Sequence, residues 1–310
     1  MLGELPKIFG RSFLIGYFLP SILLAAGNLE LLSEFFKHTP LFLQKDLILT
    51  DAGIFVAVSW FGGILLLLVN MGLLQSLEGY GRLNPARLGR RLQVRRFAKL
   101  QTEIAELDST RKSYLAGGRE FPQDLRVRRN NLKRHAAERF PHEETWLLPT
   151  SLGNVIRAFE VYPKVMYGIE GIQGWTRLVA VVSKEYVELL DDAKAQVDFW
   201  ANICFVGSFM GCEYVTLATY FRQIRAPWFP IVALLLGAIG FRMCRDAAIQ
   251  WGELVKASFD VFLADLREKL GFSPCSNEDQ EKELWTKFSQ AIIFRSPDSM
   301  PAKTQRPSEQ

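Results

Sequence analysis

The sequence predicts an all-α membrane protein with four transmembrane helices, two of which extend into a helical cytosolic domain. Four mostly apolar stretches approach or exceed the length needed to cross the hydrocarbon core of a bilayer. The mean hydropathy is +0.06 although 23% of residues are charged, so apolar and charged residues are concentrated in different segments. Basic residues gather in one long region between the second and third apolar stretches, which indicates its side of the membrane.

The first apolar stretch allows two interpretations. The four stretches are residues 12–28, 52–74, 197–221 and 226–243. The first is short, and a signal peptide cleaved near Gly27 is the alternative to a retained helix. Pro20 and the aromatic residues Phe13, Tyr17 and Phe18 favour a retained helix, because neighbouring helices can satisfy the carbonyl that a proline leaves unpaired.

Lysine and arginine predict the orientation. Residues 82–140 contain sixteen basic and six acidic side chains, a net charge of +10, whereas the connection 29–51 contains only two lysines. Positive loops remain in the cytoplasm, so we expect residues 75–196 and both termini on the cytoplasmic side of the plasma (inner) membrane. The turn between the last two stretches carries Arg222 and Arg225 on the outer side, which is an exception to this rule.

The remaining segments follow from this topology. They are a cytosolic N-terminus (1–11), an apolar outer loop (29–51), a basic helical region (75–196), cytosolic helices (244–294) and a disordered tail (295–310). Within the basic region, helices are predicted from Asn84-Pro85 to Gly117, from Pro122 to Phe140, and from Ser151 to Tyr162, where Pro163 ends the helix.

Two long helices are predicted to join the membrane to the cytosol. Ser183 is a suitable N-cap for one helix that continues through 197–221. The stretch 226–243 continues as a helical stripe to Gly271, a suitable C′ residue. The acidic side chains of the first long helix either face the basic region or are solvated; they are Glu185, Glu188, Asp191 and Asp192.

A cluster of arginines follows the second apolar stretch. Its members are Arg87, Arg90, Arg91, Arg95 and Arg96. A solvated face that also sets topology is one interpretation, and binding of anionic lipid headgroups is the other. Nucleic acid is not expected, because aromatic residues are not interleaved with these arginines and no nucleic-acid-binding signature is present.

Residues 147–178 hold the densest set of chemically distinctive residues, LLPTSLGNVIRAFEVYPKVMYGIEGIQGWTRL. The candidate network comprises Asn154, Arg157, Glu160, Tyr162, Tyr167, Trp175 and Arg177. We expect a buried structural network in which Arg157 pairs with Glu160 or a tyrosine hydroxyl; ligand or partner binding is the alternative. The glycines at 168, 171 and 174 indicate either backbone freedom between helices or a phosphate-binding loop.

This segment resembles a motif of uncharacterised bacterial multi-pass membrane proteins. The pattern is Leu-Pro-Thr-x-Leu-Gly-Asn-x-x-Arg-Ala-x-Glu, followed by Tyr-Pro, Tyr-Gly and Trp-x-Arg-Leu. The matching residues are Pro149, Thr150, Leu152, Gly153, Asn154, Arg157, Ala158, Glu160, Tyr162, Tyr167, Gly168, Trp175, Arg177 and Leu178. The resemblance covers about a tenth of the chain, and Gly174 departs from it. It implies two helices, a cytosolic region and two further helices, and implies no activity.

No catalytic, cofactor or metal motif is recognisable. The sequence lacks a Walker loop and the GxGxxG, HExxH and GxSxG patterns. The three histidines are scattered, and Cys204, Cys212, Cys244 and Cys275 form no CxxC pair. The sequence therefore predicts neither an enzyme nor a bound cofactor or metal.

Two polar side chains in the apolar stretches are candidate functional residues, Asn70 and Glu213. An ionisable group within a bilayer is costly, so we expect Glu213 to be a neutral acid that donates to Ser59 or to its own copy in an oligomer. A glutamate tolerated near the membrane interface is the alternative.

The sequence thus predicts a non-enzymatic membrane scaffold or effector with a cytosolic sensing domain. The alternative is one subunit of an oligomeric channel or transporter, since four helices are few for a transporter and would require a homo-oligomer. The lipid bilayer is the expected partner in both cases.

Overall fold

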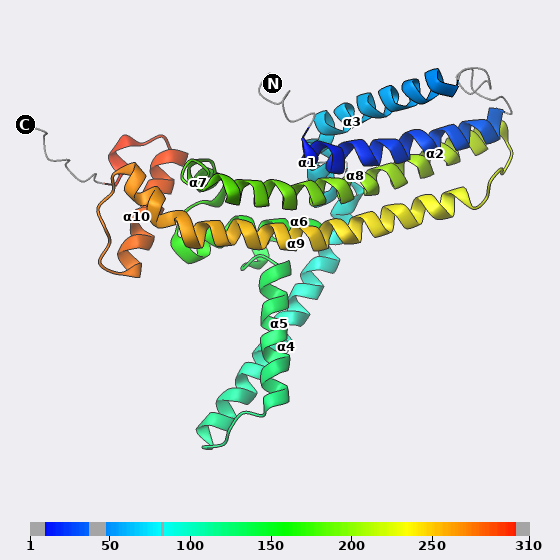
Figure 1. Cartoon of the computed structure of the whole chain (residues 1–310). Helices are drawn as coiled ribbons and strands as arrows, with labels where there is room; N and C mark the ends of the chain where they lie inside the picture. Colours follow the sequence, from blue (N-terminus) through cyan, green and yellow to red (C-terminus); the bar gives the residue numbers. More distant parts are fainter. Residues whose placement is uncertain (1–9, 37–47, 82–83, 302–310) are drawn as a thin grey trace, which may run out of the picture. The chain divides into compact units, whose positions relative to one another are not determined.

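The structure is a computed structural model that describes residues 10–36, 48–81 and 84–301, and all regular elements in these ranges are helices (Figure 1). The elements are α1 (Arg11–Phe13), the π-helical turn η2 (Leu14–Phe18), α2 (Leu19–Phe36), α3 (Ile48–Glu78), η4 (Pro85–Gly89), α4 (Arg90–Ala116), α5 (Gln123–Arg139), η5 (Glu144–Trp146), α6 (Ser151–Tyr167), α7 (Gly171–Leu178), α8 (Lys184–Phe221), α9 (Phe229–Leu270), α10 (Glu278–Ile293) and η6 (Pro297–Ser299).

The helices form two compact units. Unit 1 comprises Met1–Gly81 and Asp191–Ala248, and unit 2 comprises Arg82–Leu190 and Ile249–Gln310. Helices α8 and α9 contribute residues to both units, as the sequence predicted for two long helices.

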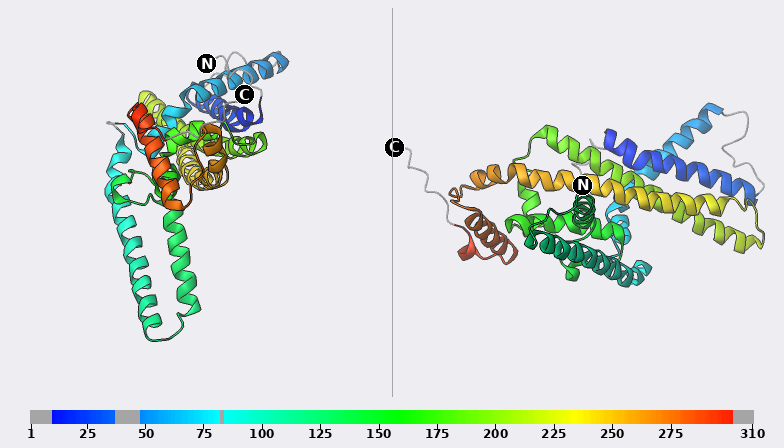
Figure 2. Two further views of the ribbon diagram at one scale, coloured as in Figure 1. Left: turned by 90° about the vertical axis from the view of Figure 1, so that its left-hand side faces the viewer. Right: turned by 90° about the horizontal axis from the view of Figure 1, so that it is seen from below.

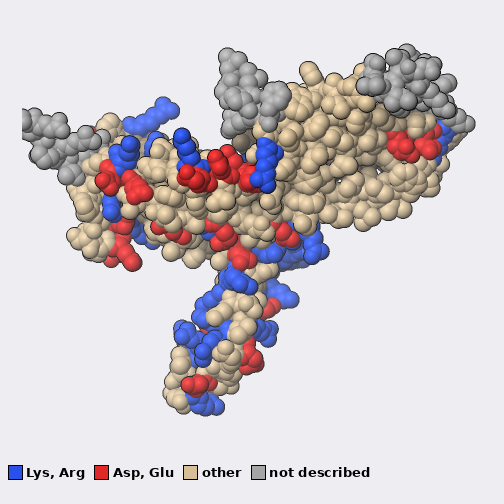
Figure 3. Space-filling model, in the orientation of Figure 1, with Lys and Arg blue, Asp and Glu red and all other residues tan. Residues whose placement is uncertain are grey.

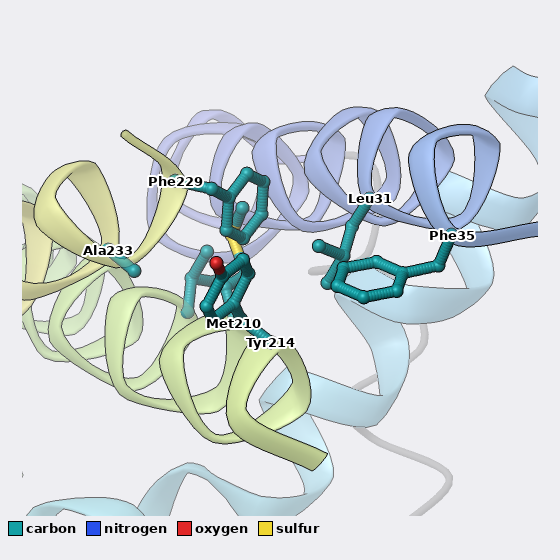
Figure 4. Close-up of a cluster of buried hydrophobic side chains, with 7 residues drawn as sticks. Leu31, Phe35, Met210, Tyr214, Phe229 and Ala233 are labelled. Carbon is teal, nitrogen blue, oxygen red and sulfur yellow. The ribbon is translucent and has the colours of Figure 1, made fainter. Parts of the chain in front are cut away.

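Unit 1 is a bundle of α2, α3 and the adjoining parts of α8 and α9. Its core contains Leu31 and Phe35 of α2, Met210 and Tyr214 of α8, and Phe229 of α9 (Figure 4). The rings of Tyr214 and Phe229 stack with their centroids 6.1 Å apart. These contacts join the first apolar segment to the last two.

Small residues allow α8 and α9 to approach closely. A Cβ atom added to Gly240 would lie 2.6 Å from the backbone nitrogen of Cys204, and one added to Gly207 would lie 2.5 Å from that of Gly237. Close backbone approach through small residues is typical of helix pairs in membranes.

Three helical segments are long and apolar enough to cross a membrane: Arg11–Phe35, Ala52–Glu78 and Lys184–Phe221. Helix α9 is not such a segment. A crossing segment has an apolar window of eighteen residues with at most two charged side chains, and the first eighteen residues of α9 include Arg242, Arg245 and Asp246. Four crossings, as expected from the sequence, are therefore not established by length and composition.

The surface of unit 1 is largely apolar. Large exposed side chains include Phe61 and Leu68 of α3 and Leu234 of α9, which are 69%, 65% and 72% exposed. Figure 3 shows a wide surface over α2, α8 and the first half of α9 with few charged side chains. Such a surface suits a hydrocarbon environment better than water.

Arg225, an exception to the charge rule, has a structural role in unit 1. Its Nη1 donates to the carbonyl oxygens of Glu34 at 2.6 Å and Phe35 at 3.3 Å, in the last turn of α2. A cation favourably satisfies the free carbonyls and the negative end of the dipole at a helix C-terminus. This contact explains a basic residue here independently of topology.

Unit 2 contains a long helical hairpin and a packed helical core. Helices α4 and α5 lie side by side in antiparallel directions (Figures 1 and 2). Helix α6 contacts α5, α7 and α10. Its apolar residues Leu152 and Val155 are buried, as are Phe259 of α9 and Trp285 of α10.

Several predicted helix ends are confirmed. The Asn84 side chain accepts a hydrogen bond from the Ala86 nitrogen, with Pro85 in the first turn. Ser183 caps α8 by accepting from the Tyr186 nitrogen. Gly271 follows α9 in a left-handed conformation (φ 77°).

Four predicted boundaries are wrong. Helix α2 continues to Phe36, so residues 29–36 are not part of a loop, and α3 begins at Ile48. Helix α6 continues through Pro163 to Tyr167, because burial of Pro163 in the fold outweighs the one backbone hydrogen bond that proline removes. In the predicted disordered tail, η6 forms a helical turn; residues 302–310 lie outside the described residues, as do 1–9 and 37–47.

Candidate functional site

Asn154 holds the start of the motif segment in place. It is fully buried in α6, where its Oδ1 accepts from the Leu148 nitrogen at 2.7 Å and its Nδ2 donates to the Leu148 carbonyl at 3.1 Å. Nδ2 also reaches Oε1 of Gln93 in α4 at 3.4 Å. The Thr150 side chain caps α6 by accepting from the Gly153 nitrogen. Asn154 is thus a structural residue that joins α4, the preceding loop and α6.

Tyr162 and Tyr167 share one carboxylate. Both hydroxyls donate to Oδ1 of Asp260 in α9, at 2.9 Å and 2.7 Å. Burial, followed by these bonds to a carboxylate, raises the pKa of Tyr162 to about 12 and raises that of Tyr167 further. Both tyrosines therefore remain neutral donors at physiological pH, and they fasten α6 to α9.

Arg157 pairs with Glu160, as predicted, but the pair is half-buried. Their charged groups are 3.5 Å apart, and each side chain is 27% exposed. The prediction that Arg157 is buried is wrong, since 27% of its side chain remains exposed. Burial raises the pKa of the Glu160 carboxyl, and the nearby Arg157 opposes this effect only in part.

An aromatic groove adjoins Glu160. This groove has a volume of about 200 Å³ and lies among α6, α7 and α9 of unit 2. The Phe159 and Trp251 rings meet edge to face with centroids 5.1 Å apart, and Trp175 lies 6.2 Å from Phe259. The lining residues are Phe159, Glu160, Pro163, Gly171, Ile172, Trp175, Thr176, Trp251, Val255 and Phe259.

The motif glycines serve close packing. Gly168 ends α6 in a left-handed conformation (φ 80°). A Cβ atom on Gly171 would lie 2.1 Å from the Glu160 carbonyl oxygen, and one on Gly174 would lie 2.8 Å from Ile169. The positive φ of Gly168 agrees with the interpretation of backbone freedom, whereas Gly171 and Gly174 allow close packing. The close packing also explains Gly174, the residue that departs from the bacterial motif.

The predicted network is divided into separate groups. Arg177 donates to the Gln173 carbonyl at 2.7 Å and lies over the Phe288 ring, 5.8 Å from its centroid. The structure therefore brings Glu160 and Trp175 together at the groove, whereas Asn154 and Arg177 stabilise other contacts of unit 2. The groove also depends on Trp251 and Phe259, which the motif does not contain.

A second polar cluster surrounds Asp198 in unit 1. Asp198 is 4% exposed and accepts from Tyr17 at 2.7 Å, from Asn70 Nδ2 at 3.0 Å, and from Lys194 at 2.7 and 2.9 Å. Asn202, one turn later, donates to the Gly16 carbonyl at 2.8 Å. Tyr17 and Gly16 belong to the π-helical turn η2, a kind of turn that is frequent at functional sites.

Sequence reasoning found Asn70 and missed Asp198. Asp198 lies just inside the third apolar stretch and follows several acidic residues, so it resembles part of a solvated face. A usable signal was present: Lys194, Asp198 and Asn202 recur every four residues and therefore lie on one side of a helix. Among the acidic residues of α8, Asp192 pairs with Arg11 of unit 1 at 3.2 Å, which neither interpretation of these residues predicted.

Glu213 does not contact its predicted partner. Its Oε2 and the Ser59 hydroxyl are both buried and have no hydrogen-bond partner among the described residues. Ser21 instead donates to the Ser59 carbonyl at 2.5 Å. The prediction that Glu213 donates a hydrogen bond to Ser59 is therefore wrong within a single chain.

The five predicted lipid-binding arginines all lie on the exposed surface of η4 and the first two turns of α4. Figure 3 shows further basic side chains along the α4–α5 hairpin. Among the described residues, no group of three or more His, Cys, Asp or Glu side chains is arranged to hold a metal ion.

Comparison with protein-family models, curated proteins and solved structures finds no match to this chain.

Proposed function

We propose that this chain is a multi-pass membrane protein whose unit 2 is a cytosolic sensing module that binds a small ligand in the aromatic groove. The observation that carries the proposal is the combination of four aromatic rings with one half-buried carboxyl in a single groove. Ligand sites are typically concave and apolar, with a few polar groups that fix orientation.

The membrane part of the proposal has four crossings in the plasma (inner) membrane. Besides the three long apolar segments, the first half of α9 exposes Ile231, Leu234, Leu235 and Ile239. These side chains suit contact with lipid, and Arg242 then lies near one end of the crossing. The net charge of +10 in residues 82–140 supports a cytosolic unit 2 and cytosolic termini.

The groove suits an organic cation with an apolar body. Aromatic faces attract cations, and a carboxylate adds a specific ion pair. Glu160 lines the groove, and its Oε2 lies 3.5 Å from Nη1 of Arg157. We therefore assign Glu160 to ligand charge recognition and Trp175 and Trp251 to the apolar body.

Phenethylamine and the neutral phenethyl alcohol are suitable probes. Binding to the purified full chain in lipid nanodiscs is measured by calorimetry. We expect the amine to bind more tightly than the alcohol, and expect Glu160→Gln to remove this preference. Trp175→Leu should weaken both probes, whereas Trp146→Leu, outside the groove, should weaken neither. Equal binding of the two probes, or no binding by folded protein, would contradict the proposed ligand class.

Transport by an oligomer is the second candidate function. The Asp198 cluster favours it, because charged groups within membrane helices often belong to ion or proton pathways. Proteoliposomes with a pH-sensitive dye would test it. Proton flux that is lost in Asp198→Asn but retained in Glu30→Gln would favour transport over sensing, and no flux above empty liposomes would exclude it under those conditions.

A further inference from the structure

The surface at the start of α4 combines charge with exposed apolar side chains. Between Asn84 and Thr102 the chain has six basic residues and no acidic residue. Leu88 and Leu92, separated by one helical turn, are 87% and 49% exposed. Arg91 and Arg95 are exposed and lie on the same side of the helix as Leu88, because they follow it by three and seven residues.

This surface faces away from the core of unit 2. The buried residues of the same helix are Gln93, Phe97, Leu100 and Ile104, which form the opposite stripe. Arg90, Arg91, Arg95 and Arg96 make no ion pair or side-chain hydrogen bond with any described residue. Other basic residues of the hairpin do pair with acids: Arg129 and Lys133 both contact Asp108. The charge of these four arginines is thus not neutralised by the part of the chain that the structure describes.

We infer that the face formed by Leu88, Arg91, Leu92 and Arg95 docks onto an anionic phospholipid surface. A basic helical face that also carries leucines suits the boundary between headgroups and acyl chains. Juxtamembrane basic clusters are attracted to anionic lipid within about a Debye length. Only five residues separate Glu78, the last residue of the second apolar segment, from Asn84, which keeps this face within reach of the bilayer. The inference rests on the proposed membrane topology.

A fluorescent label at Leu88→Cys tests the inference directly. Cys212 and Cys275 are changed to Ser in the full chain, so that the label attaches only at position 88. Cys204 and Cys244 are kept, because they are buried and resist labelling. The protein is placed in nanodiscs of phosphatidylcholine alone or with about one-third phosphatidylglycerol, each containing a spin-labelled lipid that quenches nearby fluorophores. We expect at least twofold stronger quenching with the anionic lipid, reversed in about 1 M salt, where the Debye length falls to about 3 Å.

Leu115→Cys is the matched control, because Leu115 is also exposed (57%) but lies at the other end of α4. Its label should show no dependence on lipid charge. The double variant with Arg91→Gln and Arg95→Gln should lower the ratio of docked to undocked protein, measured by quenching at position 88, by more than tenfold. Each arginine is expected to contribute a factor of about five. The same changes at Arg126 and Arg128 of α5 should leave the ratio unchanged.

Two results would overturn the inference: equal quenching at position 88 in both lipids, or quenching that persists after the Arg91 and Arg95 changes. Failure of the membrane proposal would be recognised differently. Carbonate extraction of membranes would then release the wild-type chain into the soluble fraction.

Discussion

Asp198 and Lys194 form the most consequential ion pair of unit 1. The Asp198 side chain is 6% exposed, whereas that of Lys194 is 34% exposed. A lysine can extend its ammonium toward water when it loses its partner, but a buried carboxylate cannot move in this way. The two partners are therefore not equivalent.

We predict that Lys194→Met destabilises the protein more than Asp198→Asn, in which the amide oxygen can still accept from Tyr17 or Asn70. Leaving a buried charge without its partner typically costs about 3–5 kcal/mol. We expect a loss near the lower end of this range for Lys194→Met, because Tyr17 and Asn70 still donate to Asp198. Unfolding in detergent measures the effect, and the double variant should recover part of the loss. Equal losses in both single variants would contradict the predicted asymmetry.

At Glu160 we predict an effect of pH. Burial raises the pKa of its carboxyl in the folded state above the unfolded value. The Glu160 carboxyl therefore contributes to the stability of the folded state fully at a pH below its unfolded pKa. This contribution is lost as the pH rises through its folded pKa. Glu160→Gln should flatten the fall in melting temperature between pH 4 and pH 7. Glu170→Gln, which breaks a partly exposed pair with Lys164, is the control and should cost less than about 1 kcal/mol. An unchanged pH profile in Glu160→Gln would be inconsistent with this account.

The Glu213 hypothesis is now restricted to an intermolecular partner. Its Oε2 has no partner among the described residues, so we predict that a neutral acid here donates to a second copy of the chain. Glu213→Gln should preserve the oligomer and Glu213→Ala should reduce it, as measured by native mass spectrometry. If Gln proves as disruptive as Ala, a titrating role replaces the neutral-acid role.

At the scale of the element, helix ends with local signals were predictable. Asn84, Ser183 and Gly271 act through their own backbone neighbourhood, so sequence alone locates them. Pro163 was misleading because its environment is tertiary: it is buried and forms part of the groove wall. The groove itself requires Trp251 of α9, about ninety residues from Phe159, and no local pattern reports that proximity.

We predict that Gly171→Ala damages the groove. The added Cβ would lie 2.1 Å from the Glu160 carbonyl oxygen, so α7 must move away from α6. Overpacking of this kind typically costs about 1–3 kcal/mol. The melting temperature and probe binding should both fall. Gly72→Ala in α3 is the control, since nothing lies within 4 Å of its added Cβ, and it should be neutral or slightly stabilising. A fully stable Gly171→Ala variant would argue against this packing.

For the whole molecule, the sequence predicted the all-helical class and the two long helices correctly. The number of crossings is harder to predict, because α9 combines an apolar first half with Arg242, Arg245 and Asp246 near its middle. The polar partners of Asp198 come from three separate segments, so their assembly depends on packing between distant parts of the chain.

The side of the membrane on which the chain ends tests the central claim most directly. Reporter domains that are active only in the cytoplasm or only outside it are fused after Leu115, after Gln223 and after Gln310. Four crossings predict cytoplasmic signals at Leu115 and Gln310 and an external signal at Gln223. An external signal at Gln310 would mean that α9 does not cross, and an external signal at Leu115 would contradict the cytosolic placement of unit 2.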